Sequence, residues 1–224
     1  MRLIHKIAFL LFSFVLTLQV VAQAPKGMGK SDPEAKKVLD AVSTKFKTFK
    51  AIKASFALKI ENAAGKPQGV KSGSVMMKGV KYRVSITGQE IFCDGTTVWT
   101  YDVAAKEVQV SAVDNSSGSI TPQKLFTNFY DKDFLFVLAP DVKKAGKTYK
   151  VVELTPIDKT KPFFKVVLEV DKASSVIMST RVFEKSGNRY LYAINSINTT
   201  ASIADDAFSF NPKKYPGVEV IDLR

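Results

Sequence analysis

The sequence predicts a mainly β fold of the α+β class: one curled antiparallel sheet of about 10–11 strands, with an N-terminal helix and a short helical insertion. After residue 51, apolar and polar residues alternate with a period of two through most of the chain. Turn-forming pairs such as Asp94-Gly95 and Ser186-Gly187 separate the alternating runs. No βαβ rhythm is present, which disfavours a parallel sheet. Because a sheet with so many strands twists and curls, its apolar face should lie on the inside.

The N-terminal segment, residues 1–22, has the pattern of a signal peptide. Arg2, His5 and Lys6 precede an apolar run over residues 7–21, and Ala22 provides a small residue for cleavage. The run is shorter than the roughly 20 apolar residues of a membrane span, although an uncleaved anchor is the alternative. We therefore expect export with cleavage near Ala22, a flexible linker over residues 23–30 and a single domain over residues 31–224.

Residues 31–49 predict the N-terminal helix. Ser31 or Asp32 can cap the first turn, Pro33 suits it, and Glu34 favours the N-terminal end of the helix dipole. Apolar residues recur at helical spacing and form one stripe, comprising Ala35, Val38, Leu39, Val42, Phe46 and Phe49. Another part of the chain must cover this stripe.

The strands that follow are predicted from alternation. Phe56, Leu58 and Ile60 share one face, and residues 73–77 and 82–86 continue the pattern. A three-strand meander occupies residues 89–110, where the Asp94-Gly95 pair supplies the positive backbone angles of a tight turn.

The middle of the chain predicts one or two short helices. Thr121-Pro122 resembles a helix start, and aromatic residues at helical spacing follow as far as Leu138, before Pro140. Later strands are expected over residues 149–155, 163–170, 176–184, 189–197, 208–210 and 218–222.

The residues that usually carry catalysis are scarce. His5, the only histidine, lies in the predicted signal peptide, which excludes imidazole metal sites and Ser-His or Cys-His pairs from the mature protein. Cys93 is the only cysteine, so no internal disulfide can form, and its apolar strand predicts a buried, inert thiol. The acid pair Asp205-Asp206 has the context of a turn and helix cap. We expect no enzyme, no metal and no cofactor.

Charge and composition leave two questions open. The net charge of +12 suits anionic membrane surfaces or acidic partners, or solubility alone. No nucleic-acid motif accompanies the basic residues, so no nucleic-acid partner is expected. The 16 Phe, 7 Tyr and 1 Trp could line an apolar cavity or simply pack as a core.

Several motifs resemble those of the LolA-type periplasmic lipoprotein carriers. The most specific is Asp94-Gly95-x-x-Val98-Trp99-x-Tyr101-Asp102. The likeness spans nearly the whole mature chain and also includes Phe49-x-x-Ile52-x-Ala54-Ser55-Phe56, Gly73-x-Val75, Tyr82-Arg83, Glu107-Val108, Thr121-Pro122-x-x-Leu125-Phe126, Phe208-x-Phe210-x-Pro212 and Pro216-Gly217-Val218.

The resemblance implies an incomplete β-barrel with a helical lid, and a monomer that does no covalent chemistry. It implies that acylated lipoproteins are received from an inner-membrane transporter and passed to an outer-membrane receptor. A lipid- or lipoprotein-sensing module on the same fold is the alternative. The residues expected to form the acyl-binding cavity are Phe56, Leu58, Tyr82, Val84, Ile86, Trp99, Tyr101, Phe126, Phe129, Phe164, Val166 and Leu168.

One position departs from the resemblance. The better-known carriers have a lid-latching arginine after the second strand, where this chain has Gly79. Arg83 is the nearest candidate to replace it, but strand alternation points it away from Tyr82 and Val84.

Overall fold

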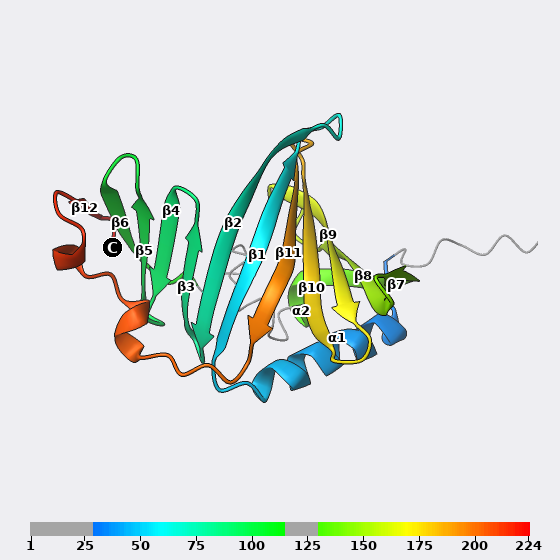
Figure 1. The fold of residues 1–224 in the computed structure, drawn as a ribbon. Coiled ribbons are helices and arrows are strands. Elements are labelled where there is room, and N and C mark those ends of the chain that lie inside the picture. The colour runs from blue at the N-terminus through cyan, green and yellow to red at the C-terminus, as the bar shows by residue number, and fades with distance from the viewer. Residues whose placement is uncertain (1–28, 115–129) are drawn as a thin grey trace, which may run out of the picture.

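The computed structural model describes residues 29–114 and 130–224, and these form one sheet with a few helices (Figure 1). In chain order the elements are α1 (Pro33–Lys47), β1 (Ile52–Glu61), β2 (Pro67–Lys78), β3 (Lys81–Ile86), β4 (Gln89–Cys93), β5 (Thr97–Asp102), β6 (Glu107–Ala112), α2 (Tyr130–Asp133), β7 (Phe134–Lys144), β8 (Lys147–Pro156), β9 (Phe163–Asp171), β10 (Val176–Glu184), β11 (Arg189–Asn198), the 3-10 helices η2 (Asp205–Phe208) and η3 (Pro212–Lys214), and β12 (Glu219–Asp222). The predicted fold class is confirmed.

The sheet has twelve strands in the order β12-β6-β5-β4-β3-β2-β1-β11-β10-β9-β8-β7. Strands β1 to β11 pair antiparallel, whereas β12 adds to the edge of β6 in parallel. The pairing of β1 with β11 joins the two halves of the chain at the centre of the sheet. The sheet curls without closing, and β12 and β7 remain as its two edges (Figure 1).

Helix α1 is capped as its sequence predicts. The Asp32 carboxylate accepts a hydrogen bond from the backbone N–H of Glu34 at 2.8 Å, and Pro33 occupies the first turn. The Asp32 backbone N–H donates to the Phe136 carbonyl at 2.8 Å, which ties the start of the helix to β7. The helix ends at Lys47, two residues earlier than predicted.

Three predicted elements need correction. Phe134 to Leu138, expected in a helix, lie in β7, because a continuous apolar run satisfies either pattern and pairing with β8 decides it. The predicted strand at residues 208–210 is replaced by η2, which ends at Phe208. In the Asp94-Gly95 turn only Gly95 has a positive φ, of 102°, while the Asp94 carboxylate caps the turn by accepting from the N–H groups of Thr96 and Thr97.

Candidate functional site

Strand register divides the sheet into two faces, and we call the one on which α1 packs the helix face. In β1, Ile52, Ala54, Phe56 and Leu58 all lie on it and are 4–7% exposed. Their cross-strand partners in β2 and β3 are apolar or glycine as far as Phe56, and include Met77, Val75, Gly73, Tyr82, Val84 and Ile86. The helix face is therefore continuously apolar through the centre of the sheet.

Helix α1 covers the β7–β10 part of this face. Leu39 and Val42 are buried with strand residues that come from β8 and β9, including Val152, Leu154, Val166 and Leu168. At the other end of the helix, Phe46 and Phe49 pack over Ile52, Met77 and Cys93. Both regions are ordinary protein core.

Continuous with the second cluster is what we call the central strip, comprising Phe56, Leu58, Val84, Ile86 and Ile91, of which Val84 and Ile91 pack against that cluster. The Phe56 ring packs directly over Gly73. A Cβ atom added at Gly73 would lie only 2.4 Å from the ring, so no larger residue fits there without a shift. On the β11 side, the Tyr192 ring lies 6.1 Å from that of Phe56 and is 37% exposed. The helix face thus becomes accessible towards the end of β1 that is remote from α1.

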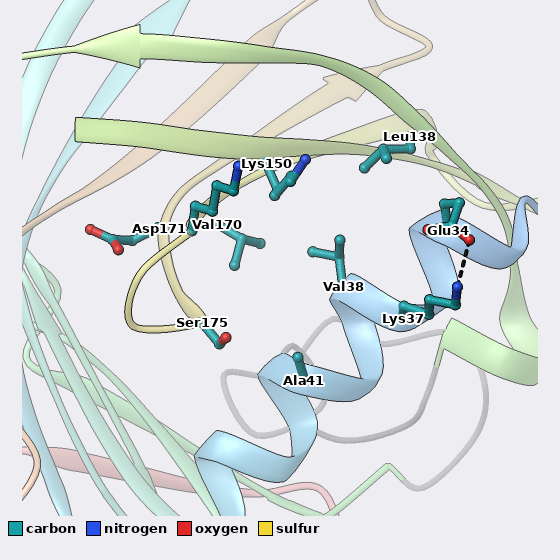
Figure 2. Close-up of a pocket in the computed structure, with 10 residues that line it drawn as sticks. Glu34, Lys37, Val38, Ala41, Leu138, Lys150, Val170, Asp171 and Ser175 are labelled. Atoms are coloured by element: carbon teal, nitrogen blue, oxygen red, sulfur yellow. Dashed lines mark hydrogen bonds and ion pairs between the residues drawn. The ribbon is translucent and has the colours of Figure 1, made fainter. Parts of the chain in front are cut away.

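A groove of about 240 Å³ lies between α1 and the β9–β10 turn (Figure 2). Its lining includes Val38, Ala41, Leu138 and Val170, and most of its charged groups already have partners. Lys37 pairs with Glu34 at 2.7 Å, Lys150 pairs with Asp141 at 2.9 Å, and the Asp171 carboxylate accepts two backbone N–H groups of its own turn. Those backbone hydrogen bonds hold the pKa of Asp171 below its usual range. The groove lies where α1 packs against the sheet, and none of the residues that line it belongs to the central strip.

The structure does not bring all the predicted site residues together. Phe56, Leu58, Tyr82, Val84 and Ile86 share the helix face, as expected. Val166 and Leu168 share it too, but they are buried beneath α1. Phe126 and Phe129 lie outside the described residues.

Trp99, Tyr101 and Phe164 depart from the expected placement. Trp99 opposes Phe92 and Tyr101 opposes Glu90, so both lie on the other side of the sheet, which we call the back face. Phe164 lies at a β-bulge in β9, where it has no partner in β10. The neighbouring pairs are Lys165 with Phe183 and Phe163 with Glu184. The Phe164 side chain is 49% exposed. Alternation had correctly placed Trp99 and Tyr101 together but could not say on which face.

The C-terminal segment closes the back face over these aromatic residues. Phe210 and Tyr215 stack with their rings 4.7 Å apart, and the Tyr101 ring lies 4.8 Å from that of Tyr215. Phe92 and Val108 complete the buried cluster, with Trp99 at its margin. The aromatic residues Phe208, Phe210 and Tyr215 in the C-terminal segment were the available sequence signal for this contact.

A polar network fixes the same segment to the sheet. Arg83 donates to the Glu90 carboxylate at 3.0 Å, and the Tyr215 hydroxyl donates to the same oxygen at 2.8 Å. The Arg83 guanidinium also lies 4.5 Å from the centre of the Phe92 ring. Burial, followed by the hydrogen bond to Glu90, raises the pKa of Tyr215 to about 12.

This network bears on the lid latch that the resemblance implies. Arg83 is committed to the back face, so it does not replace the missing arginine. Gly79 sits in the β2–β3 turn with a φ of 58°, a conformation that favours glycine. Any latch in this protein must use other side chains.

The described residues offer little for covalent chemistry. Cys93 is 1% exposed and burial raises the pKa of its thiol, as expected of an inert cysteine. Within residues 29–114 and 130–224, no cluster of His, Cys, Asp and Glu could hold a metal ion. None of the helices in this part of the chain has the length and apolar character to cross a membrane.

A family model described as outer membrane lipoprotein carrier protein LolA matches residues 47–211. The chain belongs to the LolA family. An outer-membrane lipoprotein carrier protein of Haemophilus influenzae is 30% identical over 177 residues, which cover 77% of this chain and 81% of that protein. The Neisseria gonorrhoeae protein of the same name is 27% identical over 140 residues, or 62% of each chain.

Among solved structures, an uncharacterized conserved protein from Thermus thermophilus superimposes with a TM-score of 0.57 at 11% sequence identity. The match covers 84% of this chain and 99% of the Thermus protein. At that identity the likeness shows the fold alone. The family assignment therefore rests on the sequence matches.

Proposed function

We propose that this protein is a periplasmic carrier that holds lipoprotein acyl chains against the central strip and ferries them from the inner to the outer membrane. The observation that carries the proposal is the apolar continuity of the helix face, which extends beyond the area that α1 covers. Membership of the LolA family supplies the class of cargo.

The apolar side chains of the central strip suit an acyl chain. Each methylene removed from water contributes about 0.8 kcal/mol, so even part of an acyl chain supplies useful affinity. Tyr82 borders the strip beside Val84, and Phe126 and Phe129 remain in the proposed cargo-binding set. Trp99 and Tyr101 leave it, because they pack beneath the C-terminal segment.

The remaining features of the proposal follow from the family. The donor would be an inner-membrane lipoprotein-releasing transporter and the acceptor an outer-membrane receptor. The carrier would act as a monomer without covalent chemistry, after removal of its signal peptide near Ala22. Release requires that a conformational change offset part of the acyl-binding free energy.

The test compares an acylated lipoprotein with its unacylated form. The full chain is expressed, the exported protein is purified from the periplasm, and each lipoprotein form is mixed with it in detergent-free buffer. We expect only the acylated form to stay soluble as a complex. Retention of neither form, or of both equally, contradicts acyl shielding. Retention without any effect on lipoprotein sorting in cells would favour the sensing module instead.

A further inference from the structure

Three turns meet at the end of the sheet remote from the start of β1. The β10–β11 turn contacts the β8–β9 connection, because the Lys185 backbone N–H donates to the Pro162 carbonyl at 2.8 Å and its ammonium group donates to the Lys159 carbonyl. The β1–β2 turn lies on the other side, since a Cβ added at Gly187 would lie 2.5 Å from that of Ala63. We call residues 62–66, 157–165 and 183–189 together the turn rim.

The turn rim exposes large apolar side chains. Ile157 and Phe164 are each 49% exposed. Among the exposed large hydrophobic residues of the described chain, Phe164 and Tyr192 are the only aromatic ones, and Tyr192 lies next to the rim on β11. Single exposed apolar side chains are common, so the charged groups around Phe164 decide whether this surface can bind a partner.

The Phe164 ring lies beside Phe183 and among basic groups, on the face of the sheet opposite to Tyr192. The Phe164 ring lies 6.1 Å from that of Phe183, and the Lys165 ammonium lies 4.8 Å from the centre of the Phe183 ring. The Arg189 guanidinium lies 5.8 Å from the same ring. Apolar and cationic surface is therefore interleaved, as at an interface with lipid head groups.

Several basic residues of the turn rim are without a carboxylate partner, whereas several at the opposite end of the sheet have one. There, Lys78, Lys144, Lys147 and Lys150 pair with carboxylates. On the rim, Lys165 pairs with Glu153 at 3.6 Å, whereas Lys66, Lys159, Lys185 and Arg189 form no ion pair within the described chain. Their charge is therefore available to an external anionic surface.

The location of the rim relates it to the helix face. Leu58 opposes Tyr192 and Ile60 opposes Tyr190, so the less covered part of the helix face reaches the β1–β2 and β10–β11 turns. We propose that the turn rim docks the protein on an anionic phospholipid bilayer, with Ile157 and Phe164 entering the interface. Docking would place the end of the helix face near Leu58 and Ile60 against the membrane. The relevance of this orientation to cargo rests on the proposed function, whereas the docking itself does not.

The first test measures co-sedimentation of the exported protein with vesicles of phosphatidylglycerol and phosphatidylethanolamine, and with vesicles of phosphatidylcholine. We expect binding to the anionic vesicles that weakens as salt increases, because salt screens the lysine charges. Equal binding to both vesicle types, or to neither, overturns the proposal.

Two pairs of variants locate the surface. Lys159→Gln combined with Lys185→Gln should weaken binding to anionic vesicles by more than tenfold, since each basic group near such a surface contributes about fivefold. Lys213→Gln combined with Lys214→Gln makes the same charge change on η3 and should weaken binding much less. Equal losses from both pairs would show only a general effect of net charge and overturn the assignment to the rim.

The apolar contribution has its own matched pair. Ile157→Ser combined with Phe164→Ser should lower vesicle binding severalfold, whereas Val103→Ser combined with Val220→Ser, at comparably exposed positions, should not. Each variant is also tested for retention of acylated lipoprotein without vesicles. Loss of vesicle binding with normal retention supports docking, whereas a protein that binds vesicles but retains no cargo refutes the carrier proposal alone. Binding of the rim to an acidic protein, with no vesicle binding, would replace the lipid partner.

Discussion

The two faces of the central sheet are both rich in apolar residues, yet they serve different purposes. On the back face, Phe92, Tyr101 and Val108 are sealed by Phe210 and Tyr215 from the C-terminal segment. On the helix face, α1 packs on residues of β7–β10, and the central strip lies outside that cluster, although its members Phe56 and Leu58 are only 6–7% exposed. An aromatic cluster is therefore poor evidence for a binding site until the segments that cover it are known.

The largest expected effect concerns the back face. Phe210→Ala removes a ring that is 8% exposed and should lower the free energy of unfolding by about 3–5 kcal/mol, measured by urea denaturation. Val220→Ala, at a position 51% exposed, should change it by less than about 0.5 kcal/mol. The folded Phe210→Ala protein should still retain acylated lipoprotein. If its cargo affinity fell as much as its stability, the back face would belong to the binding site.

The next effect concerns the helix face. Val84→Asn places an amide in the central strip and should weaken retention of acylated lipoprotein about tenfold, because the amide is desolvated without a partner. Ser85→Asn makes a similar change one residue along β3, where the side chain points to the back face. The measurement is a titration of cargo against each folded variant. Equal retention of cargo by the two variants would contradict the assignment of cargo binding to the helix face.

A smaller effect is expected from removing one hydrogen bond of the polar network on the back face. Tyr215→Phe removes the hydrogen bond to Glu90 and should cost about 0.5–1.5 kcal/mol of stability, with no change in cargo retention. Tyr149→Phe is the control, since the Tyr149 hydroxyl makes no hydrogen bond within the described chain. A loss no larger than that of the control would show that the ring contacts alone hold the segment.

The smallest effect is the pH dependence of that hydrogen bond. The pKa of Tyr215 is raised to about 12 from its ordinary value near 10, so the folded state favours the neutral phenol. The stabilisation is fully present below pH 10 and is lost as pH rises towards 12. The stability advantage of the natural protein over Tyr215→Phe should therefore shrink across this range. An advantage that is constant over the range would contradict the shift.

The sequence predicted the sheet, its hairpins and the N-terminal helix well, because these depend on local alternation, turns and capping. It predicted neither the pairing of β12 with β6 nor the burial of Phe210 against Tyr101, because both join residues distant along the chain. In β4, Ile91 and Phe92 are both apolar but lie on opposite faces. Alternation in this strand therefore could not identify the face that binds α1.

The candidate site was predictable only in part. Alternation grouped Phe56 with Leu58 and Tyr82 with Val84 and Ile86, and the structure joins these groups on one face. It could not distinguish Val166 and Leu168, buried under α1, from Val84 and Ile86, which are only partly buried. Phe164 was misplaced because a β-bulge shifts the alternation by one residue.

The pairing of β1 with β11 affects how the protein folds during and after its synthesis. The ribosome makes β1 near the start of the chain and β11 near its end, and Lys53 meets Asn198 only after nearly the whole chain exists. Such distant pairing is slow, because a long loop must close before the contact stabilises it. Until then β1 has one free edge, and the apolar side of the nascent hairpins is unsheltered. A chaperone that delays folding during synthesis would protect this edge, and the helix face itself is complete only when β11 has joined β1.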